Sequence, residues 1–255
     1  MSSIPSSRTS MSVLGVALAA LLSSPAQAEP PSPLFGLEDT PYGASHQEWA
    51  ARYWQWFFSL PAGAHPLFGS ADCSAGQTGR VWFLGGAFET VDEGGQLYAR
   101  ATRDCTLPSS TVLFLPLIDA ECSELEGNGA TEEELRTCAT GLGDFITQDS
   151  LLLEIDGQPV DVDLMTHRMQ SPFFSFGPLP EDNLFGVPQW SGETSPSVSD
   201  GVYVMLRPLR VGSHTIHFEA SLDPTSIGFS VFNVDVTYNL TVVHRRFYSL
   251  PSVPQ

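Results

Sequence analysis

The alternation of apolar and polar residues is most regular over residues 232–243. Apolar or aromatic side chains occupy every second position from Phe232 to Val242, and mostly polar side chains fill the positions between them. A period of two over twelve residues is typical of a β-strand with one buried face and one solvated face. Residues 201–206 and 213–220 show the same alternation over shorter lengths. These three segments predict antiparallel strands.

Other short segments rich in apolar and β-branched residues predict further strands at 80–84, 96–102, 111–118, 151–155, 159–162 and 172–176. Residues 111–118 are almost entirely apolar, as in a strand buried on both faces, and Pro116 predicts an edge position or a bulge there. Asp156-Gly157 is a hairpin turn signal. Many short strands predict a mainly β fold: an antiparallel β-sandwich with jelly-roll or Greek-key-like connections.

A different period marks residues 45–61, which hold three of the five tryptophans. Ser45 and Glu48 form a capping-box pattern, and Pro61 predicts that the helix ends near Phe58. One face of this predicted helix carries Trp49, Tyr53, Trp56 and Phe57, whereas Trp54 and Phe58 point elsewhere. A helix that is aromatic nearly all round is either enclosed in the core or lines a ligand site.

A second helix is predicted from Glu132 to about Ile146, because Thr131 can cap it and three glutamates occupy its first turn. Four cysteines in an exported chain imply two disulfides with three possible pairings. We predict Cys73–Cys105, bracing a hairpin, and Cys122–Cys138, closing an acidic loop onto this helix. No two cysteines have the C-x-x-C spacing of a metal-thiolate site.

Residues 1–28 have the pattern of a signal peptide. An apolar stretch from Met11 to Leu22 follows Arg8, and Ala26-Gln27-Ala28 is an A-x-A cleavage site. The stretch is too short to span a bilayer, so we expect no membrane span after cleavage and a secreted or periplasmic protein. The remaining residues, 29–255, predict a single β-sandwich domain that begins with an extended lead-in over residues 29–42.

The charge is strongly acidic. The sequence has 11 basic and 29 acidic residues, and all the basic ones are arginine. Loss of Arg8 with the signal peptide leaves 10 − 29 = −19. An acidic surface repels phosphate backbones, so nucleic acid is an unsuitable partner. The absence of lysine excludes P-loop, Schiff-base and S-x-x-K chemistry. The oligomeric state has no signature in the sequence.

Carboxylates beyond the predicted strand 111–118 are the main candidates for chemistry. Asp119 and Glu121, with His167, could supply acid–base catalysis as in glycoside hydrolysis. The neighbouring acids Glu124, Glu126 and Glu132 to Glu134 allow a calcium loop, although the order of an EF-hand loop is absent. A solvated acidic insert is the simpler interpretation. His214 and His217 lie three apart on a strand and so face opposite ways; we expect His214 to be a hydrogen-bonded core residue and predict no resident metal.

The tryptophans give a second candidate. Trp54 and Trp190, if exposed, could stack on sugar rings, and Trp190 lies in a long loop over residues 183–199. For Trp49, Trp56 and Trp82 we expect places in the core.

Several motifs resemble a family of uncharacterised bacterial secreted proteins: W-x-x-R-Y-W-Q-W from Trp49, C-x-x-G-Q-x-G-x-V-W-F-L from Cys73, R-D-C-T-L-P from Arg103, and P-L-R-V-G-S-H-T-I from Pro208. The resemblance implies export and a shared architecture, and it carries no activity.

The sequence therefore supports two hypotheses. The first is an exported, non-catalytic binding or structural protein, with a carbohydrate or cell-surface component as ligand. The second is a secreted hydrolase or lyase that uses clustered carboxylates and histidine.

Overall fold

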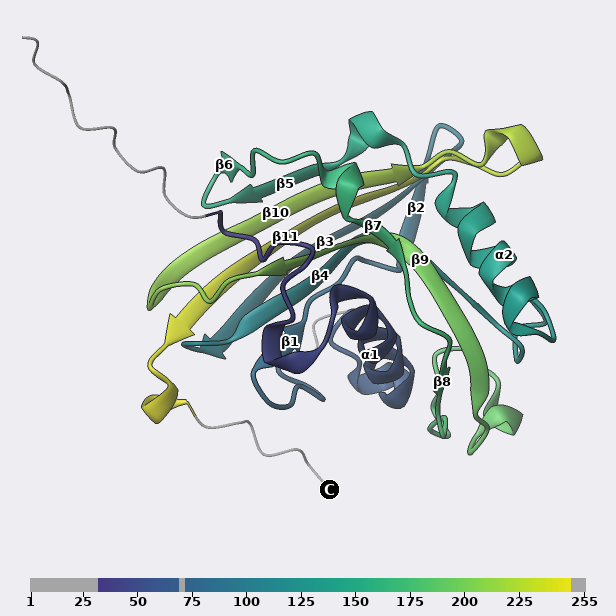
Figure 1. Ribbon diagram of the computed structural model, residues 1–255, viewed down its shortest axis with the longest axis horizontal. Coiled ribbons are helices and arrows are strands. Elements are labelled where there is room, and N and C mark those ends of the chain that lie inside the picture. The colour runs from purple at the N-terminus through teal and green to yellow at the C-terminus, as the bar shows by residue number, and fades with distance from the viewer. Residues whose placement is uncertain (1–31, 69–71, 249–255) are drawn as a thin grey trace, which may run out of the picture. The chain divides into compact units, whose positions relative to one another are not determined.

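Two β-sheets pack face to face in the computed structural model, which describes residues 32–68 and 72–248 (Figure 1). In the first sheet the order is β1 (Val81–Phe83), β4 (Val112–Ser123), β9 (Ser195–Leu206) and β7 (Arg168–Gln170), and β8 (Phe174–Phe176) also pairs with β9. The second sheet has the order β2 (Thr90–Glu93), β3 (Gln96–Pro108), β11 (Phe232–Val243), β10 (Gly212–Leu222), β5 (Leu152–Ile155) and β6 (Gln158–Pro159).

The core between the sheets is built from the alternating residues that the pattern predicts. Leu113, Leu115 and Val204 of the first sheet meet Phe218 and Val236 of the second, and all five are fully buried. The predicted mainly β sandwich is thus confirmed. Its pairing is not purely antiparallel, however, because β1 runs parallel to β4 and β3 runs parallel to β11.

Helix α1 (His46–Ser59) forms a third layer on the other face of the first sheet (Figure 1). The predicted capping box is present: the Ser45 backbone N–H donates to a Glu48 carboxylate oxygen at 2.8 Å, and the Glu48 N–H donates to Ser45 Oγ at 3.2 Å. Leu60 is extended ahead of Pro61, which ends the helix as expected.

The aromatic residues of α1 make it a buried element rather than an open surface. Its side chains pack with Phe114 of β4 and with Tyr203 and Met205 of β9 in a second hydrophobic cluster. Trp49 and Trp56 are buried in this cluster, and Trp82 is buried in the core between the sheets, as expected. Burying an aromatic side chain fully contributes on the order of 2–3 kcal/mol, so tertiary packing supplies most of this helix's stability.

Both predicted disulfides are present. Cys73–Cys105 ties the segment after residue 71 to β3, rather than bracing a hairpin, and its Cα atoms are 5.7 Å apart. Cys122–Cys138 joins the end of β4 to helix α2 (Glu132–Gly143) and closes the acidic loop as predicted. The helix ends three residues earlier than expected, because the weak helix formers Gly141 and Gly143 lie at its end.

Removing the second disulfide by Cys122→Ser with Cys138→Ser should lower the free energy of unfolding by about 3 kcal/mol, since the bridge restricts a 16-residue separation in the unfolded chain. Urea unfolding followed by tryptophan fluorescence measures the change. An unchanged unfolding midpoint would contradict the prediction.

Several element bounds differ from the sequence-based expectations. Strand β3 continues to Pro108, β9 begins at Ser195 inside the segment expected to be a loop, and β2 and β7 were not predicted. The signal peptide and the first residues of the expected lead-in lie outside the described residues. The described part of the lead-in contacts β9, because Leu34 bridges to Leu206. In the described segments, no helix has both the length and the apolar character needed to cross a bilayer.

Candidate functional site

Polar side chains interrupt the apolar face of the first sheet where it meets α1. Asp119 and Glu121 project from β4, Ser197 and Tyr203 from β9, and the Trp54 indole reaches this region from α1. We call these five residues the carboxyl cluster. The Ser197 hydroxyl donates to Glu121, and the Tyr203 hydroxyl donates to Ser199 Oγ at 3.1 Å. The two candidate carboxylates from the sequence are thus neighbours on one face of β4.

Burial favours the protonated form of both carboxyl groups in the cluster. It raises the pKa of Asp119 to about 7, against the opposing effect of the Tyr203 hydroxyl and the Trp54 N–H. Asp119 Oδ2 and Trp54 Nε1 are both fully enclosed, and neither forms a hydrogen bond of ordinary geometry. The pKa of Glu121 is raised by burial, by its hydrogen bond with Glu126 and by the charge of Glu126. The cluster therefore combines a carboxyl group that ionises near neutrality with one that keeps its proton.

His167, the third predicted catalytic residue, lies next to the cluster but faces a different partner. It ends the 3-10 helix η4 (Leu164–His167), beside the backbone of Tyr203. Burial lowers the pKa of His167. Burial also lowers the pKa of His46, and the charge of His167 is the next largest cause of that shift. His46 is fully buried at the start of α1. Burial thus favours the neutral form of both histidines.

The two tryptophans proposed to bind sugars occupy different environments. Trp54 is 6% exposed and packs edge-on to Phe57 and stacked on Phe58, so its ring faces are not open to a ligand. The exposure on which its sugar-binding role depended is not met, because α1 turns this residue toward β4. Trp190, on the 3-10 helix η5 (Pro188–Trp190), is half-buried and meets Phe185 edge-on at 5.2 Å.

An open groove lies on the other side of α1, between the helix and β1. Its volume is ≈ 660 Å³, and its lining includes Tyr42, Trp49, Arg52, Trp56 and Arg80. We call it the aromatic groove. The Arg52 guanidinium lies 4.5 Å from the centre of the Trp49 ring, a distance at which a cation interacts favourably with an aromatic face. Among the described residues that line the groove there is no carboxylate.

The rim of the aromatic groove holds an exposed tyrosine in a costly backbone conformation. Tyr42 is 51% exposed and has φ 56° and ψ 29°, in the left-handed region. This conformation costs a residue other than glycine roughly 1–2 kcal/mol. The Trp49 indole N–H fixes the rim by donating to the Pro41 carbonyl at 3.0 Å. Strained residues of this kind gather at binding sites. Sequence reasoning missed Tyr42, Arg52 and Arg80, although Arg52 lies one helical turn from Trp49.

Residues of the acidic insert and two of the histidines, His214 and His217, have partners within the chain. Glu134 caps α2, and Glu126 accepts from Ser123, which are local structural roles. His214 bonds Asp156 at 2.8 Å and the Arg210 carbonyl at 2.9 Å, as expected, but it is half-buried near the start of β10 rather than in the core. Among the described residues, one group could share an ion: His217, Glu219 and Asp235, on the outer face of the second sheet. Its histidine already bonds Asp235 at 3.1 Å and Glu154 at 3.3 Å, so the group forms an ion-pair network and does not indicate a metal.

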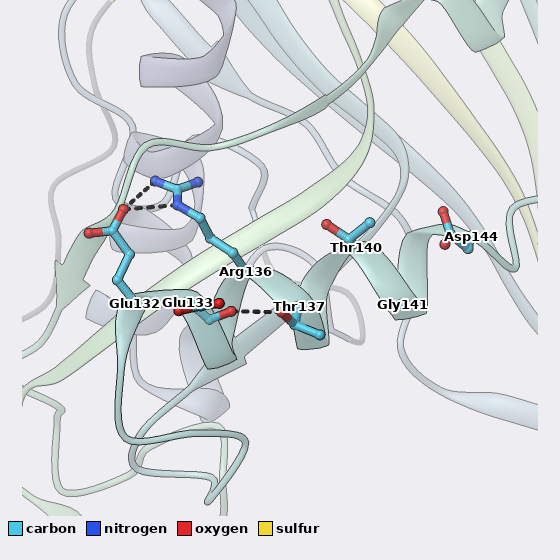
Figure 2. A pocket seen from close by; sticks show the side chains of 7 residues that line it. All are labelled: Glu132, Glu133, Arg136, Thr137, Thr140, Gly141 and Asp144. Atoms are coloured by element: carbon cyan, nitrogen blue, oxygen red, sulfur yellow. Dashed lines mark hydrogen bonds and ion pairs between the residues drawn. The ribbon is translucent and has the colours of Figure 1, made fainter.

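A shallow hollow of ≈ 700 Å³ follows the solvent face of α2, and Figure 2 shows its side chains arranged along that helix. Arg136 Nε bonds Glu132 at 2.8 Å, and the Thr137 hydroxyl donates to the Glu133 carbonyl at 2.8 Å (Figure 2). Because Arg136 is already paired with Glu132 and the Thr137 hydroxyl with a backbone carbonyl, we assign no ligand to this hollow.

No family model, curated protein or solved structure matches this chain. The resemblance to a family of secreted proteins stays a prediction, and function must be argued from the geometry alone.

Proposed function

We propose that the chain is an exported binding protein whose aromatic groove accepts a carbohydrate. The observation that carries the proposal is Tyr42, an exposed aromatic ring held in a strained conformation at the groove's rim. A sugar ring can stack its apolar face on such a side chain while its hydroxyls reach the neighbouring polar groups. Gln55 and Thr78 supply such groups in the lining. The signal-peptide pattern and the two disulfides support an extracellular or periplasmic location.

Replacing Tyr42 by asparagine tests this function. Asparagine tolerates the left-handed backbone, so the substitution removes the ring without adding strain. Titration of the protein with neutral and acidic oligosaccharides, chosen from a glycan array and followed by tryptophan fluorescence, should show saturable binding. Affinity should fall about tenfold in Tyr42→Asn, the loss of roughly 1.4 kcal/mol of stacking.

The matched control is Phe229→Asn, which removes an aromatic ring that is 66% exposed on the loop between β10 and β11. It should bind like the wild type. Absence of binding to every saccharide, or an unchanged affinity in Tyr42→Asn, would remove the proposal. Trp190→Ala is the corresponding test of the half-buried tryptophan at η5, and it should leave binding unchanged if the aromatic groove is the site.

A second candidate function rests on the carboxyl cluster, because it holds the acid and base forms that hydrolysis or elimination requires. In this hydrolase or lyase hypothesis Glu121 protonates a leaving group and Asp119 acts as the base. Incubating the protein with a panel of polysaccharides, and following reducing ends and unsaturated products, tests it. Loss of a measured activity in Glu121→Gln, with Glu124→Gln unchanged, would support it, and an inactive wild-type protein would exclude these substrates.

A further inference from the structure

The aromatic groove has the opposite charge to the chain around it. The sequence has 29 acidic and 11 basic residues, so a hollow of average composition would contain more carboxylates than guanidinium groups. The lining instead contains Arg52 and Arg80, and none of the described residues in it is acidic. A low-dielectric wall focuses the field of such charges into the groove, which therefore favours anions on a molecule whose overall charge repels them.

The two guanidinium groups are free to bind a ligand. Four arginines form ion pairs elsewhere: Arg100, Arg136, Arg168 and Arg207. Among the described side chains, by contrast, no carboxylate oxygen lies within 4.0 Å of a guanidinium nitrogen of Arg52 or Arg80. Glu48 is the acid that interacts with Arg52 through its charge, and its carboxylate is held by the Ser45 backbone N–H at 2.8 Å.

Contacts hold the Arg52 side chain and the Arg80 backbone in place. Arg52 rests on the face of Trp49, whose indole is itself hydrogen-bonded to the rim. The Arg80 carbonyl accepts the Val112 N–H at 2.8 Å, which fixes its backbone to the start of β4, and its side chain is exposed. Guanidinium groups match carboxylate and sulfate groups with two parallel hydrogen bonds, and prior positioning reduces the entropy lost on binding.

We infer that the ligand of the aromatic groove is an acidic saccharide, whose carboxylate or sulfate group is bound by Arg52 and Arg80 while a sugar ring stacks on Tyr42. This inference rests on the proposed binding function and specifies its ligand class.

The experiment compares three probes against the full mature chain by calorimetric titration: an oligogalacturonate, a heparin-derived oligosaccharide and a neutral cello-oligosaccharide. At least one acidic probe should bind at least tenfold more tightly than the neutral one, because a charged hydrogen bond contributes more binding free energy than a neutral one. Binding of that probe should weaken as salt rises, as expected for solvent-accessible charges. The preference between the first two probes distinguishes carboxylate from sulfate.

Arg52→Gln and Arg80→Gln should each weaken binding of the acidic probe by roughly tenfold and leave binding of the neutral probe unchanged. Arg210→Gln is the matched control, since it removes an exposed arginine outside the groove, and it should have no effect. Equal binding of acidic and neutral probes, unaffected by either groove substitution, would overturn this inference and leave the binding function intact. Failure of all three probes would overturn the inference, while the wider saccharide panel would decide the proposed function separately.

Discussion

Gly201→Ala is expected to lower the free energy of unfolding by about 3 kcal/mol or more. Gly201 lies on β9 directly opposite Asp119 of β4. A Cβ atom at this position would lie 2.6 Å from both Asp119 Cα and the Ile118 carbonyl oxygen, and still closer to Asp119 Cβ. Two of these atoms are backbone atoms of the paired strand, so the strands must separate to accommodate the methyl group. Separation would also disturb the carboxyl cluster beneath α1.

Urea unfolding followed by tryptophan fluorescence measures this loss, because α1 carries most of the tryptophans. Gly141→Ala is the matched control: an added Cβ there meets no atom within 4 Å, and alanine favours the helix. It should leave stability equal or slightly higher. If Gly201→Ala unfolded at the wild-type urea concentration, the close approach of β4 and β9 described above would be incorrect.

The strands with a regular apolar period could be predicted from the sequence because burial there follows the local pattern. Strand β11 has the bounds that its alternation indicates, and the capping residues of α1 fix its first turn. The same local reasoning found Cys122–Cys138, which closes a short segment of chain. Cys73–Cys105 was paired correctly, although it does not brace the hairpin that motivated the pairing. These features depend on residues close to one another in the sequence, where pairing and periodicity are directly readable.

The first half of β9 could not be recognised in this way. Residues 195–200 read Ser-Pro-Ser-Val-Ser-Asp, a composition typical of loops. They form a strand because Ser197 contacts Glu121 and the Ser199 backbone N–H bonds Ser171 Oγ at 2.9 Å, and both partners are distant in the sequence. Polar residues on this face match a polar neighbour rather than an apolar core. Local propensity gave the wrong answer where tertiary contacts decide.

The candidate sites likewise include residues that a local pattern could identify and residues that only the fold brings together. Asp119 and Glu121 could be identified as neighbours because residues two apart on a strand share a face. The position of Trp54 above Asp119 depends on how α1 is rotated against β4, which no local pattern specifies. Tyr42 and Arg80 both line the aromatic groove, although they are distant in the sequence and lie in segments without periodicity. Their juxtaposition is a property of the fold alone.

Stability should depend on pH through Asp119 in a direction opposite to that of most carboxylates. Its pKa is about 7 in the folded chain because burial disfavours the charge, whereas the ordinary value is 3.8. Between these pH values the folded state holds a proton that the unfolded state has lost, so raising the pH favours unfolding. The resulting loss of unfolding free energy begins near pH 4 and grows until about pH 7. Above that pH it is constant, at about 4 kcal/mol. The raised pKa of Glu121 adds a cost in the same direction.

Asp119→Asn removes this titration while keeping the size of the side chain. Relative to the wild type, the variant should therefore gain up to about 4 kcal/mol of unfolding free energy as the pH is raised from 4 to 7. Urea unfolding of both proteins at several pH values gives this difference directly. The titration of the other groups cancels, because it is the same in the two proteins. Asp149→Asn, a substitution on the exposed 3-10 helix η3 (Gln148–Ser150), should run parallel to the wild type. A difference between Asp119→Asn and the wild type that stayed constant with pH would mean that the Asp119 carboxyl is ionised in the folded protein throughout this range, as it is in the unfolded chain, and that burial does not raise its pKa.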